Sequence, residues 1–415
     1  MKTTFTFKRQ AITLCFACFL FLVGSLHASA VELYENGTNT VAQGEQVGLW
    51  EKQINTDSLT KKAPFFIEAT VRYGCLISNN SPIKDYAYAT PGFDIAVGKQ
   101  SIGLHDYEQY CNYPRYGLAF QYNKCVLPTA DTTIADYGDR CSLYGFIDFP
   151  LWTSGRWTLY FQPGLGLAFW TKPADKKDVN SVGNMLNECI GSVVNVHIDL
   201  AMLLSFNLTE QWNVVAGGQF FHSSNGALKR PNFGLNAPTV LLGLGYQFNE
   251  GKRPTYIHKV YDPYIRQNEI YMFLAPGVRQ SKATDAYYFS NTLEVGYGRL
   301  FSPIWRWNAG VDFCYDGDFQ NYIGKEKKGK FKNSIGIAPF AGLEAAMHRV
   351  ALSVALAGYA YRPSKGFESF YERAGVKYLI GKEKQAFVGV SVKAHAGSVE
   401  FIEWTVGTAL YRWKD

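Results

Sequence analysis

The sequence has few charged residues and no long apolar run outside its first 30 residues. Charged residues make up 18% of the 415 residues, and hydrophobic residues make up 47%. A membrane-spanning helix needs roughly 18 consecutive apolar residues, and no stretch after residue 30 approaches that length. Disordered chains and coiled coils are rich in charge. The composition therefore excludes both classes, and the missing apolar runs argue against membrane helices.

The net positive charge is also small once the N-terminal segment is removed. Lys2, Lys8 and Arg9 precede the apolar run 11–26, and three small residues follow at 28–30. This order is typical of a cleaved signal peptide. Removal of its three positive charges lowers the formal charge from +6 to +3, which is too weak to indicate a nucleic-acid partner.

What the sequence has in excess is aromatic residues, which make up 16% of the chain. Aromatic side chains form girdles at both interfaces of outer-membrane barrels, whose strands alternate between lipid-facing and interior residues. Segments with this period of two recur throughout the chain from residue 63. The first eight predicted strands are 65–77, 88–101, 115–125, 141–152, 156–170, 190–208, 212–224 and 236–248. The next eight are 268–279, 286–300, 304–314, 332–345, 349–361, 370–380, 385–395 and 400–412.

These strands predict an all-β protein, a transmembrane antiparallel β-barrel of the outer membrane of a Gram-negative-type bacterium. Long and short intervals alternate between most of the strands, as surface loops and periplasmic turns do in such barrels. We expect two tandem eight-stranded barrels, although periodicity leaves one barrel of about sixteen strands open. The predicted parts are a signal peptide (1–30), a polar segment (31–62), a first barrel (63–248), a linker (249–267) and a second barrel-like half of unknown role (268–415).

Two further pairings are suggested by position along these strands. Cys125 and Cys141 flank one predicted loop in a chain exported to an oxidising compartment, which makes them a plausible disulfide, with free buried thiols as the alternative. In the second half, alternation places His395 and Glu403 in the interior of neighbouring strands. We expect those two residues to form a structural pair.

The candidate chemistry lies where the seventh and eighth strands approach the predicted cell surface. Even-numbered residues of 212–220 are apolar or small, so this face contacts lipid, and His222 and Ser224 continue it. Asn236 is in register with the lipid face of the next strand. Polar side chains facing lipid cost free energy and indicate a functional site.

These residue types suit nucleophilic catalysis. A serine hydroxyl becomes a nucleophile when an imidazole accepts its proton, and a third group must fix the imidazole tautomer. Residues i and i+2 of a strand share a face about 7 Å apart, which lets the side chains of His222 and Ser224 meet. Asn225, Gly226 and Asn232 in the following turn are candidates for oxyanion or loop support.

Residues 222–236 (HSSNGALKRPNFGLN) closely resemble the signature of the outer-membrane lipid A 3-O-deacylase (PagL-like acyloxyacyl hydrolase) family. The resemblance extends over about 65–248. It implies a small barrel whose residues at the positions of His222 and Ser224 hydrolyse an ester-linked acyl chain of lipid A in the outer leaflet, without metal or cofactor. One position departs from the pattern, because Asn236 stands where the first-described members carry a glutamate.

The resemblance implies an outer-membrane serine esterase, a carboxylic ester hydrolase acting on lipid A of lipopolysaccharide or a related outer-leaflet glycolipid. Ser224 would be the nucleophile, His222 the general base and acid, and Asn236 the orienting residue. The main alternative is a porin, adhesin or structural barrel with a vestigial motif, which the lost carboxylate at position 236 favours. A further alternative is an acyltransferase or phospholipase that uses the same dyad.

Overall fold

The computed structural model describes residues 63–77, 88–127, 134–175, 186–248, 254–257, 266–323, 328–363, 368–395 and 398–414. The predicted signal peptide and the polar segment up to residue 62 lie outside these ranges, as does most of the predicted linker. None of the helices within the described ranges is long and apolar enough to cross a membrane.

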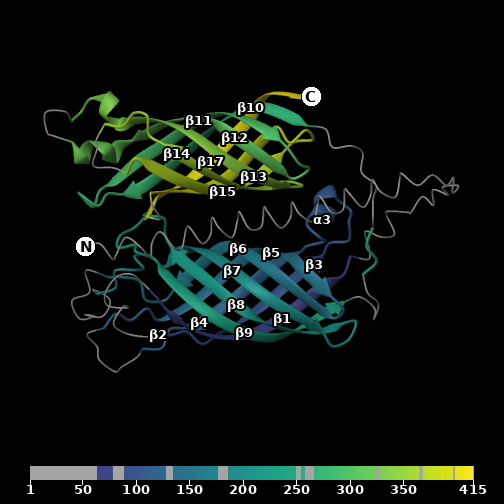
Figure 1. Cartoon of the computed structure of the whole chain (residues 1–415). Coiled ribbons are helices and arrows are strands. Elements are labelled where there is room, and N and C mark those ends of the chain that lie inside the picture. The colour runs from purple at the N-terminus through teal and green to yellow at the C-terminus, as the bar shows by residue number, and fades with distance from the viewer. Residues whose placement is uncertain are drawn as a thin grey trace.

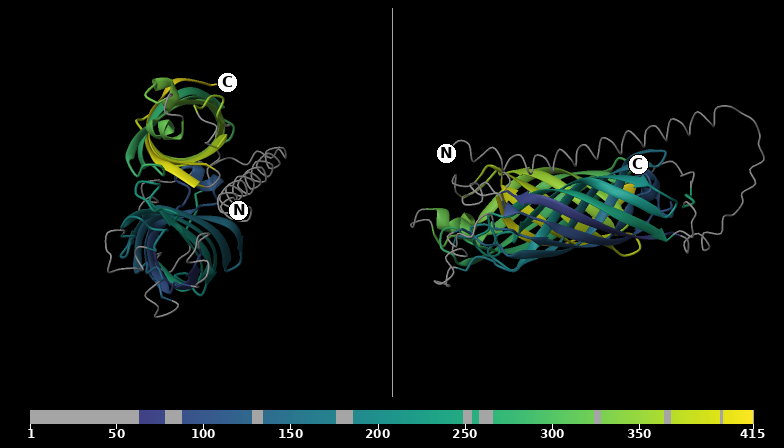
Figure 2. Two further views of the ribbon diagram at one scale, coloured as in Figure 1. Left: turned by 90° about the vertical axis from the view of Figure 1, so that its left-hand side faces the viewer. Right: turned by 90° about the horizontal axis from the view of Figure 1, so that it is seen from below.

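The chain forms two closed β-barrels that lie side by side (Figures 1 and 2). The N-terminal barrel contains β1 (Phe65–Leu76), β3 (Gly92–Gln100), β4 (Arg115–Lys124), β5 (Asp139–Ser154), β6 (Trp157–Trp170), β7 (Val194–Asn207), β8 (Trp212–Ser224) and β9 (Leu235–Phe248). It closes where β1 pairs with β9. The two-residue strand β2 (Tyr88–Ala89) pairs with the end of β1, and Ala89 also bridges Val126, so the predicted strand 88–101 is interrupted after Ala89.

The C-terminal barrel is a second antiparallel ring of eight strands. It contains β10 (Gln267–Gln280), β11 (Tyr287–Leu300), β12 (Trp305–Asp316), β13 (Ile335–Met347), β14 (Val350–Gly358), β15 (Phe370–Ile380), β16 (Ala386–His395) and β17 (Ser398–Lys414). It closes where β10 pairs with β17. The predicted pair of tandem eight-stranded barrels is therefore confirmed, and the single barrel of about sixteen strands is excluded.

Alternating side chains give each barrel an apolar outer surface and a polar interior. Along β1, Phe65, Val71 and Tyr73 are exposed on the outside, whereas Glu68 and Arg72 are buried inside. This is the pattern that a strand needs when one face meets lipid and the other meets the lumen.

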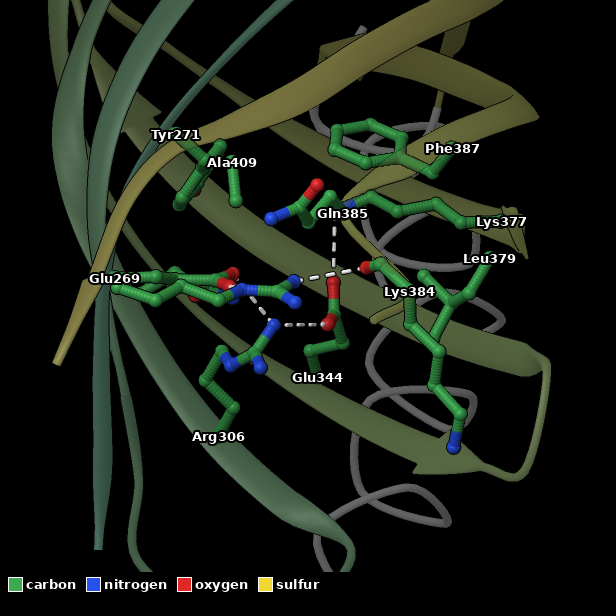
Figure 3. A pocket seen from close by; sticks show the side chains of 12 residues that line it. Glu269, Tyr271, Arg306, Glu344, Lys377, Leu379, Lys384, Gln385, Phe387 and Ala409 are labelled. Atoms are coloured by element: carbon green, nitrogen blue, oxygen red, sulfur yellow. Dashed lines mark hydrogen bonds and ion pairs between the residues drawn. The ribbon is translucent and has the colours of Figure 1, made fainter. Parts of the chain in front are cut away.

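Ion pairs and hydrogen bonds fill the lumens. In the N-terminal barrel, the Arg115 guanidinium lies 2.7 Å from the Asp148 carboxylate. In the C-terminal barrel, Arg306 bridges Glu269 at 2.6 Å and Glu344 at 3.2 Å (Figure 3). Buried charges persist in a protein interior when partners of opposite charge satisfy them. The lumens are thus packed cores.

The barrels contact each other through residues that would otherwise face lipid. Trp305 at the start of β12 points outward but is only 2% exposed, because it packs in one cluster with Phe149 and Phe161 of the N-terminal barrel. Beside this cluster, His105 precedes the short helix α3 (Asp106–Tyr110), and its ring stacks on that of His348 at 4.2 Å. Apolar packing therefore joins the two barrels at the end opposite to the β8–β9 connection.

Two predicted pairings are wrong. The six described cysteines are free thiols. Cys125 belongs to a buried cluster, whereas Cys141 is partly exposed and lies opposite Tyr122 on the neighbouring strand, so no Cys125–Cys141 disulfide forms.

The expected contact between His395 and Glu403 is also replaced by another. Glu403 lies opposite Ser391, earlier on β16 than His395, and the register of β16 with β17 shifts between Lys393 and Ala394 so that the bulged residue Glu400 is buried beside His395. The His395 Nε2 therefore lies 2.7 Å from Glu400 Oε2.

Candidate active site

The site residues are brought together by the pairing of β8 with β9. His222 lies directly opposite Asn236 in the antiparallel register, and Ser224 follows two residues later on the same face of β8. Burial alternates along β8, with odd-numbered residues such as Gln219 and Phe221 buried in the interior. His222 and Ser224 therefore belong to the outward-facing set.

The three side chains form a hydrogen-bonded row. His222 Nδ1 lies 2.8 Å from Asn236 Oδ1, and His222 Nε2 lies 2.9 Å from Ser224 Oγ. An amide oxygen only accepts hydrogen bonds, so Nδ1 carries the proton and donates it to Asn236. This tautomer leaves the Nε2 lone pair free to accept the Ser224 hydroxyl proton. The row thus has the connectivity of a nucleophile, a base and an orienting group.

The β8–β9 loop (225–234) holds its shape through a network centred on Asn225. The Asn225 N–H donates to Asn232 Oδ1 at 2.9 Å. The Asn225 amide nitrogen donates to the Lys229 carbonyl at 2.7 Å and to Ser192 Oγ at 2.9 Å. Asn225 is only 2% exposed. Its side chain therefore supports the loop and is not free to bind an oxyanion.

Within the described part of the chain, the unpaired donors of the loop follow Ser224 in the sequence. Among the described residues, no acceptor pairs with the backbone N–H groups of Gly226 and Ala227 or with Asn232 Nδ2. Gly226 has φ +62 and Ala227 has φ +63. Successive backbone N–H groups in such turns can form anion-binding concavities. These N–H groups and the Asn232 amide are the candidate donors for an oxyanion.

Gly234 fits against the histidine ring, a contact that the sequence analysis missed. A Cβ built at Gly234 would lie 2.7 Å from His222 Cε1, and the residue has φ +75. Both the contact and the left-handed backbone require glycine. The glycine was visible within the motif at 222–236, but its contact depends on loop geometry that periodicity does not report.

The lumen-facing side of β8 holds a second contact that was not predicted from the sequence, between Ser223 and Arg140. Ser223 is buried in the lumen, where it lies 3.4 Å from Arg140 Nε. The Arg140 guanidinium also stacks on the Phe221 ring at 3.8 Å. The adjacent serines 223 and 224 therefore have different surroundings, and only Ser224 is paired with His222. Among the described residues, no group of three or more His, Cys, Asp or Glu side chains is arranged to hold a metal ion.

Comparisons with known proteins cover both barrels. The family model described as lipid A 3-O-deacylase (PagL) matches residues 93–247. The model described as acyloxyacyl hydrolase, C-terminal domain, matches residues 267–415. The resemblance inferred from the sequence extended over about 65–248, and the second match adds the C-terminal barrel. A comparison with curated proteins found no match.

Two solved structures are similar to part of the chain. Neisserial surface protein A (NspA) is 13% identical, with a TM-score of 0.29, and the match covers 45% of this chain and 96% of that one. The outer membrane enzyme PagL is 13% identical, with a TM-score of 0.28, and the match covers 42% of this chain and 97% of that one.

The barrel fold and the family matches define a deacylase-type enzyme of the Gram-negative outer membrane. The N-terminal barrel carries the match to the lipid A 3-O-deacylase (PagL) family, and the C-terminal barrel carries the match to the acyloxyacyl hydrolase C-terminal domain.

Proposed function

We propose that this protein is a serine esterase that removes an ester-linked acyl chain from lipid A of lipopolysaccharide, or from a related glycolipid of the outer leaflet. The observation that carries the proposal is the hydrogen-bonded row of Ser224, His222 and Asn236 on the outward face of the barrel. A lipid ester lying beside the barrel wall would reach this row without entering the lumen. The lipid A 3-O-deacylase match over residues 93–247 supports the substrate class.

The reaction would proceed in two steps through an acyl-enzyme. Ser224 Oγ attacks the ester carbonyl carbon, and its proton passes to His222 Nε2. The tetrahedral intermediate collapses, the bond to the sugar oxygen breaks, and Nε2 returns the proton to that oxygen. A water molecule then attacks the acyl-enzyme with His222 as the base, which releases the fatty acid and restores the Ser224 hydroxyl.

The other residues would stabilise these steps. Asn236 would keep the proton on His222 Nδ1, so that Nε2 faces the serine throughout the cycle. The negative oxygen of the tetrahedral intermediate needs donors fixed in advance. The N–H groups of Gly226 and Ala227 and the Asn232 amide would supply them, and Asn225 would hold the loop in place. The chemistry assigned to these residues involves no metal or cofactor.

The test is mass spectrometry of lipid A from cells that express the parent protein or Ser224→Ala. We expect the parent to remove one acyl chain and Ser224→Ala to lower the rate by about 10³-fold or more, as loss of a nucleophile does in serine hydrolases. Ser223→Ala is the matched control, because the neighbouring hydroxyl faces the lumen. Heat-dependent electrophoretic mobility would show that each variant is a folded barrel.

The result would also separate the proposal from its alternatives. Unchanged lipid A in cells with a folded parent protein would contradict the esterase and favour a barrel with a vestigial motif. An acyl chain transferred to another lipid would indicate an acyltransferase, and shortened phospholipids would indicate a phospholipase.

A further inference from the structure

The C-terminal barrel touches the loop that follows the proposed nucleophile. Gln280, the last residue of β10, donates its backbone N–H to the Ala227 carbonyl at 3.0 Å. Its side-chain oxygen accepts the Arg230 backbone N–H at 2.7 Å, and its carbonyl accepts from Arg230 Nε at 2.9 Å. One residue of the C-terminal barrel thus makes three hydrogen bonds to the β8–β9 loop of the N-terminal barrel.

A second contact is apolar and lies on Gly226. Ile402 belongs to the outward face of β17, which would otherwise meet lipid. It is only 8% exposed, whereas Trp404 and Val406 on the same face are 63% and 55% exposed. A Cβ built at Gly226 would lie 2.3 Å from Ile402 Cγ1. The loop therefore covers Ile402, and the isoleucine packs directly against the backbone that follows Ser224 and Asn225.

These contacts are made to the residues of the loop that have a left-handed backbone conformation. Ala227 has φ +63, a left-handed conformation that costs free energy for a residue with a Cβ atom. Such a conformation persists when surrounding structure holds it. Within the N-terminal barrel, Ser192 and Asn232 anchor Asn225. Gln280 and Ile402 of the other barrel contact the next two residues, Gly226 and Ala227.

We propose that the C-terminal barrel is a positioning element for the active site, and that Gln280 and Ile402 hold the Gly226 and Ala227 N–H groups in the orientation that the oxyanion requires. The proposal rests on the esterase function proposed above. It gives residues 267–415 a role in the reaction of the N-terminal barrel, since neither Gln280 nor Ile402 touches the reacting atoms.

The test uses substitutions on β17 of the full-length protein, with purified lipid A as substrate. Ile402→Ala removes the contact on Gly226, Ile402→Val keeps most of it, and Val406→Ala is a matched truncation on the same outward face. A displacement of about 1 Å at a catalytic group can lower the rate by about 100-fold. We expect Ile402→Ala to lower kcat by about tenfold or more with KM within twofold of the parent, and both other variants to keep the parental kcat.

A second pair of variants tests the polar contact without altering the apolar one. Gln280→Ala removes the acceptor for the Arg230 N–H, whereas Gln280→Glu replaces the amide oxygen with a carboxylate oxygen that can accept the same hydrogen bond. Both variants lose the hydrogen bond from the Gln280 amide nitrogen to the Asp285 carbonyl. We expect Gln280→Ala to lower kcat with little change in KM and Gln280→Glu to restore it, which a general loss of stability would not produce.

The outcomes separate this inference from the proposed function. A fully active parent, an inactive Ser224→Ala, and parental kcat in both Ile402→Ala and Gln280→Ala would overturn the positioning role and leave the esterase intact. An inactive, folded parent would overturn both. A fall in kcat that Ile402→Val and Gln280→Glu reverse would establish that the C-terminal barrel positions the loop.

Discussion

At the scale of single residues, the unusual feature of the site is the amide of Asn236 at a position where the resemblance of residues 222–236 implies a carboxylate. Asn236 Oδ1 lies 2.8 Å from His222 Nδ1, so the amide fixes the tautomer as a carboxylate would. It has no net charge, however, and stabilises the imidazolium less when His222 takes the serine proton. The substitution therefore acts on the rate of the proposed reaction more than on its type.

Asn236→Asp tests this point because the two side chains have the same shape. A hydrogen bond to a charged partner contributes about 1.5 kcal/mol more than one between neutral groups, which corresponds to about tenfold in rate. We expect kcat to rise by about tenfold, while Asn236→Leu, which accepts no hydrogen bond, should lower it by about 100-fold. Steady-state kinetics on purified lipid A would measure both. An unchanged kcat in Asn236→Asp would show that imidazolium formation does not limit the rate.

Gly234→Ala tests the fit of the loop against the histidine. The added Cβ would lie 2.7 Å from His222 Cε1, and φ +75 strains any residue with a side chain. The ring must move, so we expect a loss of about 100-fold in kcat. Gly218→Ala is the control, because it lies on the same face of β8 and its Cβ would meet no atom within 4 Å. Equal activity of the two variants would show that the ring position is not critical.

At the scale of strands, alternation predicts most of the architecture. The period of two located sixteen strands and assigned His222 and Ser224 to the outward face, because each residue of a barrel strand faces either lipid or lumen. Alternation fails where the pairing is irregular. The register shift between Lys393 and Ala394 brings Glu400 next to His395, and nothing in the residue types of these strands predicts that shift.

The sequence also did not predict the contacts that loops make with the site or the contacts between the two barrels. Gly234 and Ser192 reach the site through loop conformations, and Gln280 reaches it from a different barrel. Periodicity within a strand carries no information on such distant neighbours. The catalytic candidates could therefore be predicted from residues 222–236. The residues that support them could be identified only from the three-dimensional structure.

The cysteines give a prediction at the strand scale. Cys111 follows helix α3 and is fully buried, and burial raises the pKa of its thiol to about 12. Only the thiolate reacts with iodoacetamide, so folded protein at pH 8 should leave Cys111 unmodified.

Alkylation after unfolding without reductant completes this test. Cys125 and Cys141 should both be modified, because neither forms a disulfide. Peptide mass spectrometry would measure each site. A disulfide-linked Cys125–Cys141 peptide that is present without reductant and disappears on reduction would contradict the arrangement of β4 and β5.

At the scale of the whole molecule, the protein consists of two barrels that contact each other near both ends. Trp305 packs on the N-terminal barrel near α3, and Gln280 bonds to the β8–β9 loop at the other end. Two contacts far apart along the barrels restrict rotation of one barrel against the other. Each barrel thus has a fixed neighbour on a surface that lipid would otherwise cover.

A porin needs an open, water-filled lumen, so the packing of the two barrel interiors bears on whether this protein could conduct ions. In the C-terminal barrel, Arg373 bridges Glu294 at 2.6 Å and Glu403 at 2.7 Å across the interior. Two cavities in this barrel measure about 10 and 30 Å³, and each has room for about one water molecule. In the N-terminal barrel, Arg115 and Asp148 form a similar bridge. In both interiors, buried ion pairs therefore occupy space that an aqueous channel would need.

We therefore expect no conductance steps when the purified protein is reconstituted in planar bilayers at high salt. An eight-stranded barrel is filled by its own side chains, whereas barrels of about sixteen strands conduct through an aqueous channel. A general porin inserted in the same way controls for the sensitivity of the measurement, and deacylase activity of the reconstituted sample would show that the protein is present and folded. Stable porin-like steps from that sample would mean that the ion pairs of Arg115 and Arg373 open in the membrane, and the packed lumens described above would be wrong.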